Sequence, residues 1–80
     1  MIWFKVNDRW CFDVTQIRDF GIPKDRTGTI MVTYKDGTEE YYGTDNPAET
    51  FARLIEFVNT LYLPITAYNT TEEVREIGMV

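Results

Sequence analysis

Four acidic side chains fall in one short stretch of the sequence and are the residues best placed to do chemistry. They are Asp36, Glu39, Glu40 and Asp45. Carboxylate oxygens are the ligands that Mg²⁺ prefers, so the stretch could hold a cation for a nuclease-like reaction. However, an Asp before Gly suits a tight turn, and an acid suits the start of a helix. We therefore expect structural roles for these acids and keep a metal-dependent nuclease as the weakest alternative.

Few other residues could support catalysis. The chain has no histidine and one cysteine, Cys11, so the usual general acid–base group and a Cys/His zinc site are both excluded. It contains no Gly-rich phosphate loop and no nucleophile elbow. Cys11 has no histidine to activate it, and Lys5 is the only basic residue that we expect beside it. We predict that the protein is not an enzyme and uses no metal or cofactor.

The charge and length of the chain limit the classes of partner that we expect. The 80 residues make one domain, and the net charge of −5 comes from 13 acidic and 8 basic side chains. Such a surface disfavours nucleic acid and anionic membranes, both of which attract cationic proteins. A lone thiol with no signal peptide and no membrane-length apolar run favours a cytoplasmic location. Because a small domain without disulfide or metal has a small core, we also expect a homodimer or higher homo-oligomer.

The N-terminal segment predicts a β-hairpin over residues 2–6 and 10–15. A three-residue turn at Asn7–Arg9 would place every large apolar residue except Trp3 on one face, which is why we prefer it to a two-residue turn. The resulting cross-strand pairs are Val6–Trp10, Phe4–Phe12 and Ile2–Val14. This register predicts that Trp10 is buried and that Trp3 lies outside.

A second hairpin follows a connection over residues 16–28, in which Ile17 and Phe20 should reach the core. Asp36-Gly37 between alternating apolar residues is a strong signal for a two-residue turn with positive φ at both positions. The predicted pairs are Lys35–Thr38, Thr33–Glu40 and Met31–Tyr42. Met31 and Tyr42 would then lie on the outer face of the sheet.

A long helix should begin after Asn46, a good N-cap followed by Pro47, and end before Leu63-Pro64. Its apolar residues repeat at helical spacing: Phe51, Leu54, Ile55, Val58, Leu61 and Tyr62. Phe57 lies off this stripe. Residues 65–68 should be extended, and a capping box at 70–73 predicts a short helix through Ile77.

The expected fold is therefore α+β. It has an antiparallel sheet of about four strands, made of two hairpins, with one long helix on one face and a short C-terminal helix. Residues 1–62 would form the sheet-plus-helix core of the single domain 1–80, and residues 63–80 a C-terminal extension.

The order of these elements resembles the small flagellar protein family known as FlbD. The residues that carry the likeness are Asn7, Phe12, Ile17, Ile30, Val32, Asp36, Gly37, Glu49, Ile55 and Val58. The resemblance spans residues 5–58, whereas the connection at 18–28 is longer and residues 63–80 have no counterpart. What the resemblance implies is the fold: hairpin, connection, second hairpin and helix.

Aromatic residues left outside the predicted core suggest a contact surface. Tyrosine and tryptophan bury a large area at low entropic cost, which favours them at interfaces. The expected partner-binding residues are Trp3, Met31, Tyr42 and Phe57, unless segment 63–80 covers them. The best functional reading is a small binding protein that acts by protein–protein contact, as an inhibitor or adaptor.

A ligand-sequestering protein is the alternative from another class. An interface pocket lined by Trp3, Tyr42, Arg53 and Tyr68 would hold a small nucleotide-like molecule. Phage-encoded mini-proteins that inhibit host defences act in both ways, and this chain resembles them in size and composition.

Overall fold

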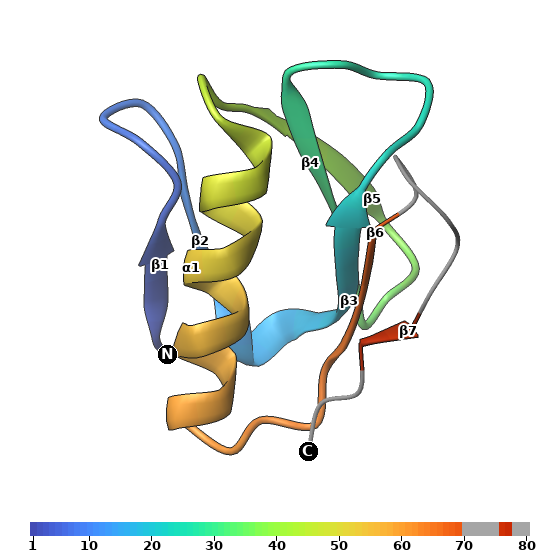
Figure 1. The fold of residues 1–80 in the computed structure, drawn as a ribbon. Coiled ribbons are helices and arrows are strands. Elements are labelled where there is room, and N and C mark those ends of the chain that lie inside the picture. The colour runs from blue at the N-terminus through green and yellow to red at the C-terminus, as the bar shows by residue number, and fades with distance from the viewer. Residues whose placement is uncertain (70–75, 78–80) are drawn as a thin grey trace.

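The chain forms a two-stranded sheet, a five-stranded sheet and one long helix, as seen in a computed structural model that describes residues 1–69 and 76–77 (Figure 1). The α+β class is therefore confirmed. In chain order the elements are β1 (Trp3–Lys5), β2 (Cys11–Asp13), a 3₁₀ turn η1 (Val14–Gln16), β3 (Ile17–Ile22), β4 (Thr29–Tyr34), β5 (Glu39–Gly43), α1 (Pro47–Thr60), β6 (Thr66–Asn69) and β7 (Glu76–Ile77). No helix in these described residues is long and apolar enough to cross a membrane.

The first hairpin has the predicted register. Phe4 pairs with Phe12, and the Val6 N–H donates to the Trp10 carbonyl at 2.9 Å. The side-chain Oδ1 of Asn7 accepts from the backbone N–H groups of Arg9 and Trp10 and so fixes the three-residue turn. Phe4, Phe12 and Val6 are buried as expected.

The prediction that Trp10 is buried is wrong, because its side chain is 46% exposed. It stands at the turn end of the hairpin, where its ring meets one aromatic neighbour, Tyr42, edge-on at 6.1 Å. Alternation along a strand determines on which face of the hairpin a side chain lies. It does not determine whether other residues pack over that face at the end of the strand.

The larger sheet is mixed, not antiparallel throughout. Its order is β5-β4-β3-β6-β7, and β3 runs parallel to β6. The hairpin β1–β2 forms its own sheet instead of joining it. The central strand β3 lies in the segment that we predicted to be a connection. An irregularity in pairing between Ile17 and Asp19 breaks the two-residue alternation, which hid the strand. Ile17 and Phe20 are nevertheless in the core, as predicted.

The second hairpin is displaced by one residue from the predicted register. Met31 pairs with Tyr41, and Ile30 pairs with Tyr42. The turn has three residues, since the Tyr34 N–H donates to the Thr38 carbonyl, and only Gly37 within it has positive φ, at 93°. A slip of one residue moves every side chain of β5 to the opposite face. Tyr42 therefore points toward the core, not away from it.

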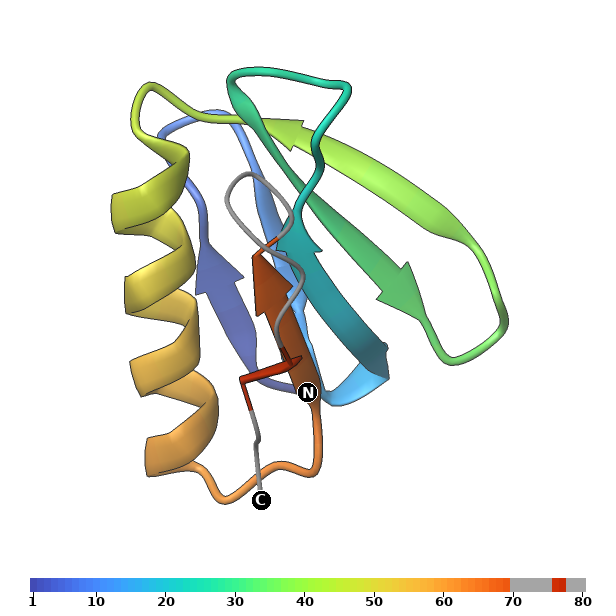
Figure 2. The same cartoon turned by 45° about the vertical axis from the view of Figure 1, so that its right-hand side comes forward.

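Helix α1 begins as predicted and ends earlier. Asn46 Oδ1 accepts from the Glu49 N–H at 3.1 Å, and Pro47 starts the first turn. Phe51, Leu54 and Val58 are buried, but Tyr62, which we placed on the same stripe, is 81% exposed. The helix ends at Thr60, and Tyr62 adopts a left-handed φ of 54° that turns its side chain outward. Figure 2 shows α1 along one side of the molecule, with β4 and β5 on the opposite side.

The C-terminal part extends the core beyond residue 62. Residues Thr66–Asn69 are extended, as predicted, and form strand β6 beside β3. Ile65 and Ala67 are buried with the other core residues, so this segment belongs to the sheet-plus-helix core. Most of the predicted C-terminal helix lies outside the described residues, and Glu76–Ile77 form strand β7, not a helix.

Strands β3 and β6 approach each other at a glycine. A Cβ built on Gly21 would lie 2.5 Å from the Tyr68 carbonyl oxygen and 2.7 Å from its ring. The Tyr68 ring thus lies over the place where another residue would carry a side chain. This close approach explains why the central strand contains a glycine that weakens its sequence signal.

We expect Gly21→Ala to lower the free energy of unfolding by about 1–3 kcal/mol, because the added methyl forces backbone or ring to shift. Gly43→Ala is the matched control, since a Cβ there meets nothing within 4 Å. Urea unfolding followed by circular dichroism measures both. Equal stability of the two variants would contradict the close packing of β3 against Tyr68.

Candidate protein-binding surface

The four predicted partner-binding residues do not form one surface. Trp3 is exposed on the hairpin β1–β2, and Met31 lies in β4 next to Gly21 of β3. Tyr42 is packed against the core. Phe57 packs on Phe4 with ring centroids 5.4 Å apart. Of the four, Trp3 alone remains a large exposed side chain.

The alternative ligand-binding set is dispersed as well. Trp3 and Arg53 line two separate pockets. Tyr68 lies against Gly21 on the five-stranded sheet, where burial is the main cause that raises its pKa. The described chain thus does not assemble Trp3, Tyr42, Arg53 and Tyr68 around one cavity.

Tyr42 joins the hairpin to the larger sheet. Its ring lies 5.1 Å from that of Phe12, and its hydroxyl forms a hydrogen bond of 2.5 Å with the hydroxyl of Tyr34. Burial and then this hydrogen bond raise the pKa of Tyr34 well above its ordinary value of 10.0. Tyr42 therefore has a structural role between the two sheets.

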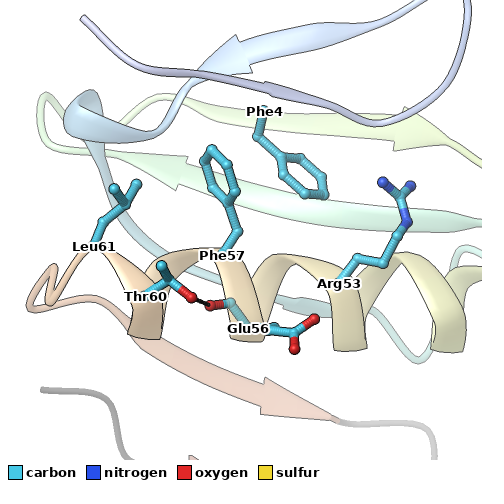
Figure 3. Close-up of a pocket in the computed structure, with 6 residues that line it drawn as sticks. All are labelled: Phe4, Arg53, Glu56, Phe57, Thr60 and Leu61. Atoms are coloured by element: carbon cyan, nitrogen blue, oxygen red, sulfur yellow. Dashed lines mark hydrogen bonds between the residues drawn. The ribbon is translucent and has the colours of Figure 1, made fainter.

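A shallow pocket of about 340 Å³ lies between β1 and α1 (Figure 3). It is lined by Phe4, Arg53, Glu56, Phe57, Thr60 and Leu61. The guanidinium of Arg53 donates to the carbonyls of Lys5 (3.2 Å) and Val6 (3.0 Å) and lies over the Phe4 ring. Because its cation is already bound to the backbone of β1, this pocket works as the contact between helix and hairpin.

The second depression lies on the other side of the hairpin. Its volume is about 280 Å³, and it is lined by Trp3, Lys5, Asn7, Asp8, Arg9, Trp10 and Cys11. We call this surface the tryptophan face. Trp3 is 55% exposed and Trp10 is 46% exposed, and they are the two tryptophans of the chain. Sequence reasoning found Trp3 but missed Trp10, whose position directly after a turn was the available signal.

The tryptophan face is locally cationic. Lys5 lies 3.5 Å from Asp8, but their side chains are 71% and 99% exposed, so solvent weakens this pair. The side chain of Arg9 has no hydrogen bond or ion pair within the described residues. Asp13, the cross-strand partner of Trp3, lies outside this lining; it accepts hydrogen bonds from Ile2 and Thr15, and the Thr15 hydroxyl is the main cause that lowers its pKa.

Among the acidic residues considered for a metal site, Asp36 has a local role in its turn. Asp36 Oδ1 accepts from the Thr38 N–H at 2.9 Å, and this hydrogen bond is the main cause that lowers the pKa of Asp36. In the part of the chain that the structure describes, no group of three or more Asp, Glu, Cys or His residues is placed to hold a metal ion. That the protein is not an enzyme stays a prediction.

Removing the guanidinium should loosen the hairpin. We expect Arg53→Met to lower stability by about 1 kcal/mol and to accelerate amide hydrogen exchange in β1 and β2 more than in β3 and β4, since two bonds to β1 are lost. Arg18→Met is the control, because Arg18 pairs with its neighbour Asp19. Unchanged exchange in the hairpin of the Arg53 variant would show that the contact is not needed.

The Tyr34–Tyr42 pair predicts sensitivity to alkali. In the unfolded chain Tyr34 loses its hydroxyl proton near pH 10, whereas the folded protein holds that proton to higher pH. The contribution of Tyr34 to the free energy of unfolding is therefore complete below about pH 10 and decreases as the pH rises above it. Tyr34→Phe should flatten this fall in urea midpoints, with a remainder from Tyr68. Tyr62→Phe, at an exposed site, should keep the wild-type slope. A wild-type slope in Tyr34→Phe would refute the assignment.

Comparisons with known proteins give no relative for this chain. No family model matches it, and neither characterised proteins nor solved structures give a significant match. What this chain binds is therefore inferred from the geometry of the tryptophan face.

Proposed function

We propose that this chain is a small non-enzymatic binding protein that contacts a partner protein through the tryptophan face. The observation that carries the proposal is the exposure of both tryptophans, 55% and 46%, beside one depression. Tryptophan is the residue type most enriched among the energetically dominant residues of interfaces, together with tyrosine and arginine. An inhibitor or an adaptor would act in this way.

The free-energy cost of exposing two tryptophans to solvent supports the proposal of a protein-binding surface. Most other large apolar residues of the described chain enter the core, including four of the five phenylalanines, and the exceptions among the strongly exposed are Met1 and Tyr62. A tryptophan side chain buries about 150–250 Å² when it packs, and a small domain gains much from each such residue. Leaving two of them in solvent on one strand pair is unfavourable for the isolated protein. A partner that covers them would recover that burial energy.

The support behind the tryptophan face favours binding as well. The opposite side of the hairpin is packed through Phe4 on Phe57 and through Phe12 on Tyr42. The Asn7 amide donates to the Gly43 carbonyl at 2.8 Å and ties the turn to β5. A surface already fixed in place loses little conformational entropy when it binds.

Other proposals remain from the sequence. Self-association is proposed on composition, and a small nucleotide-like ligand is the alternative function. The geometry favours protein contact over the second, because the residues proposed to hold the ligand lie on different surfaces.

Truncation of the two tryptophans tests the proposal. Trp3→Ala should change the free energy of unfolding by less than about 1 kcal/mol, because its side chain is more than half exposed, whereas Trp10→Ala also loses the edge-on contact with Tyr42 and should cost about 1–2 kcal/mol. A core tryptophan would cost about 3–5 kcal/mol. Affinity capture from a lysate of the source cells should lose its retained proteins with either variant.

Tyr62→Ala is the matched control, since it removes an exposed aromatic ring from another part of the surface. It should retain the same proteins as the wild type. Equal capture by a folded Trp3→Ala/Trp10→Ala double variant would refute the proposed contact surface.

A further inference from the structure

We infer that the partner of the tryptophan face is an acidic peptide segment of another protein, which inserts an apolar side chain between Trp3 and Trp10. This inference rests on the proposed function and names the chemistry of its partner. Its support is the local charge, the size of the depression and the poor fit of a second copy of this chain.

Local charge is the first step. The lining of the depression contains Lys5 and Arg9 against one acid, Asp8, and is therefore net positive by one charge. The whole chain carries −5. Arg9 has no side-chain partner among the described residues, and the exposed Lys5–Asp8 pair is weak. Complementary charges on the partner's side would be Asp or Glu.

The size and lining of the depression are the second step. Its volume of about 280 Å³ lies just below the roughly 300–1,000 Å³ that is typical of small-molecule pockets. Both tryptophans line the depression, and the ring contacts of the described residues include Trp10 on Tyr42 but none between Trp3 and Trp10. An apolar side chain of a peptide can therefore lie between them, and the rim of Lys5 and Arg9 can meet acids on either side of it.

A second copy of the chain fits less well. Two-fold pairing through this face would bring Lys5 and Arg9 of one copy near the same residues of the other, and like charges across an interface are unfavourable. Head-to-tail contact with an acidic surface of another copy would need a rotation that closes a ring, and would otherwise build an open filament. A separate acidic partner avoids both difficulties.

Selection from a random peptide library on the wild-type protein tests the inference. Enriched peptides should carry Asp or Glu next to an apolar residue, and their affinity should fall as salt concentration rises. Binding is measured by tryptophan fluorescence, excited selectively over the five tyrosines, which reports on this face because it contains both tryptophans of the chain. The Lys5→Glu/Arg9→Glu variant should bind the enriched peptides at least about fivefold more weakly.

The matched control is Lys24→Glu/Lys35→Glu, which changes the net charge equally at exposed sites away from the face. It should keep the wild-type affinity within about twofold, because screened charges at a distance contribute little. An equal loss in both double variants would show a general charge effect and overturn the inference.

The outcomes separate this inference from the proposed function. Peptides without acidic bias that need Trp3 and Trp10 but not Lys5 and Arg9 would overturn the acidic partner and leave the binding face intact. Tighter binding of a single-stranded oligonucleotide than of any enriched peptide would overturn it in favour of base stacking. No enrichment at all would overturn both.

Quenching of the free protein gives a second test that needs no ligand. Anionic iodide should quench the tryptophan emission more strongly than caesium, despite the net charge of −5, if Lys5 and Arg9 govern the local field. Lys5→Glu/Arg9→Glu should reverse this order. Stronger quenching by caesium in the wild type would overturn the inference.

Discussion

The register of the β4–β5 hairpin decides how the rest of the molecule packs. A three-residue turn that ends at Gly37 pairs Tyr42 with Ile30 and thereby directs Tyr42 to the core side of the sheet. From that position its ring meets Phe12, and its hydroxyl bonds to Tyr34. The hairpin β1–β2 can then dock by aromatic packing, although it shares no ladder of hydrogen bonds with the larger sheet. In the other register, Tyr42 would leave the hairpin without this contact.

A hairpin held in this way presents two different sides. Its inner side carries the buried residues Phe4 and Phe12 and is attached to α1 through the two hydrogen bonds of Arg53. A two-stranded sheet alone is marginally stable in water, so these attachments are what keep it ordered. Trp3 lies on its outer side, and Trp10, at the turn end, lines the same depression while its ring meets Tyr42 edge-on. Rigid support and exposed aromatic rings together are typical of binding surfaces.

The charge beside the tryptophans differs in sign from the net charge of the chain. An acidic chain repels other acidic molecules at long range, which limits unspecific contacts. The cationic residues beside the tryptophans form a local exception, where Arg9 has no competing partner within the described residues. Apolar burial would supply the affinity, while the charges would select among partners and orient them.

The sequence alone determined the local features. The caps of α1, the three-residue turn of the first hairpin and the exposure of Trp3 could be predicted, because each depends on neighbouring residues and on regular alternation. Tertiary structure decided the features that depend on distant residues. Strand β3 exists because β4 and β6 pair with it on both sides, and Gly21 is required there by Tyr68, far along the chain. Trp10 is partly exposed because the described residues do not cover the turn end of the hairpin, and Tyr42 is partly buried because the turn sets one of two registers. Alternation fixes only which side a residue takes, whereas packing decides whether that side is covered.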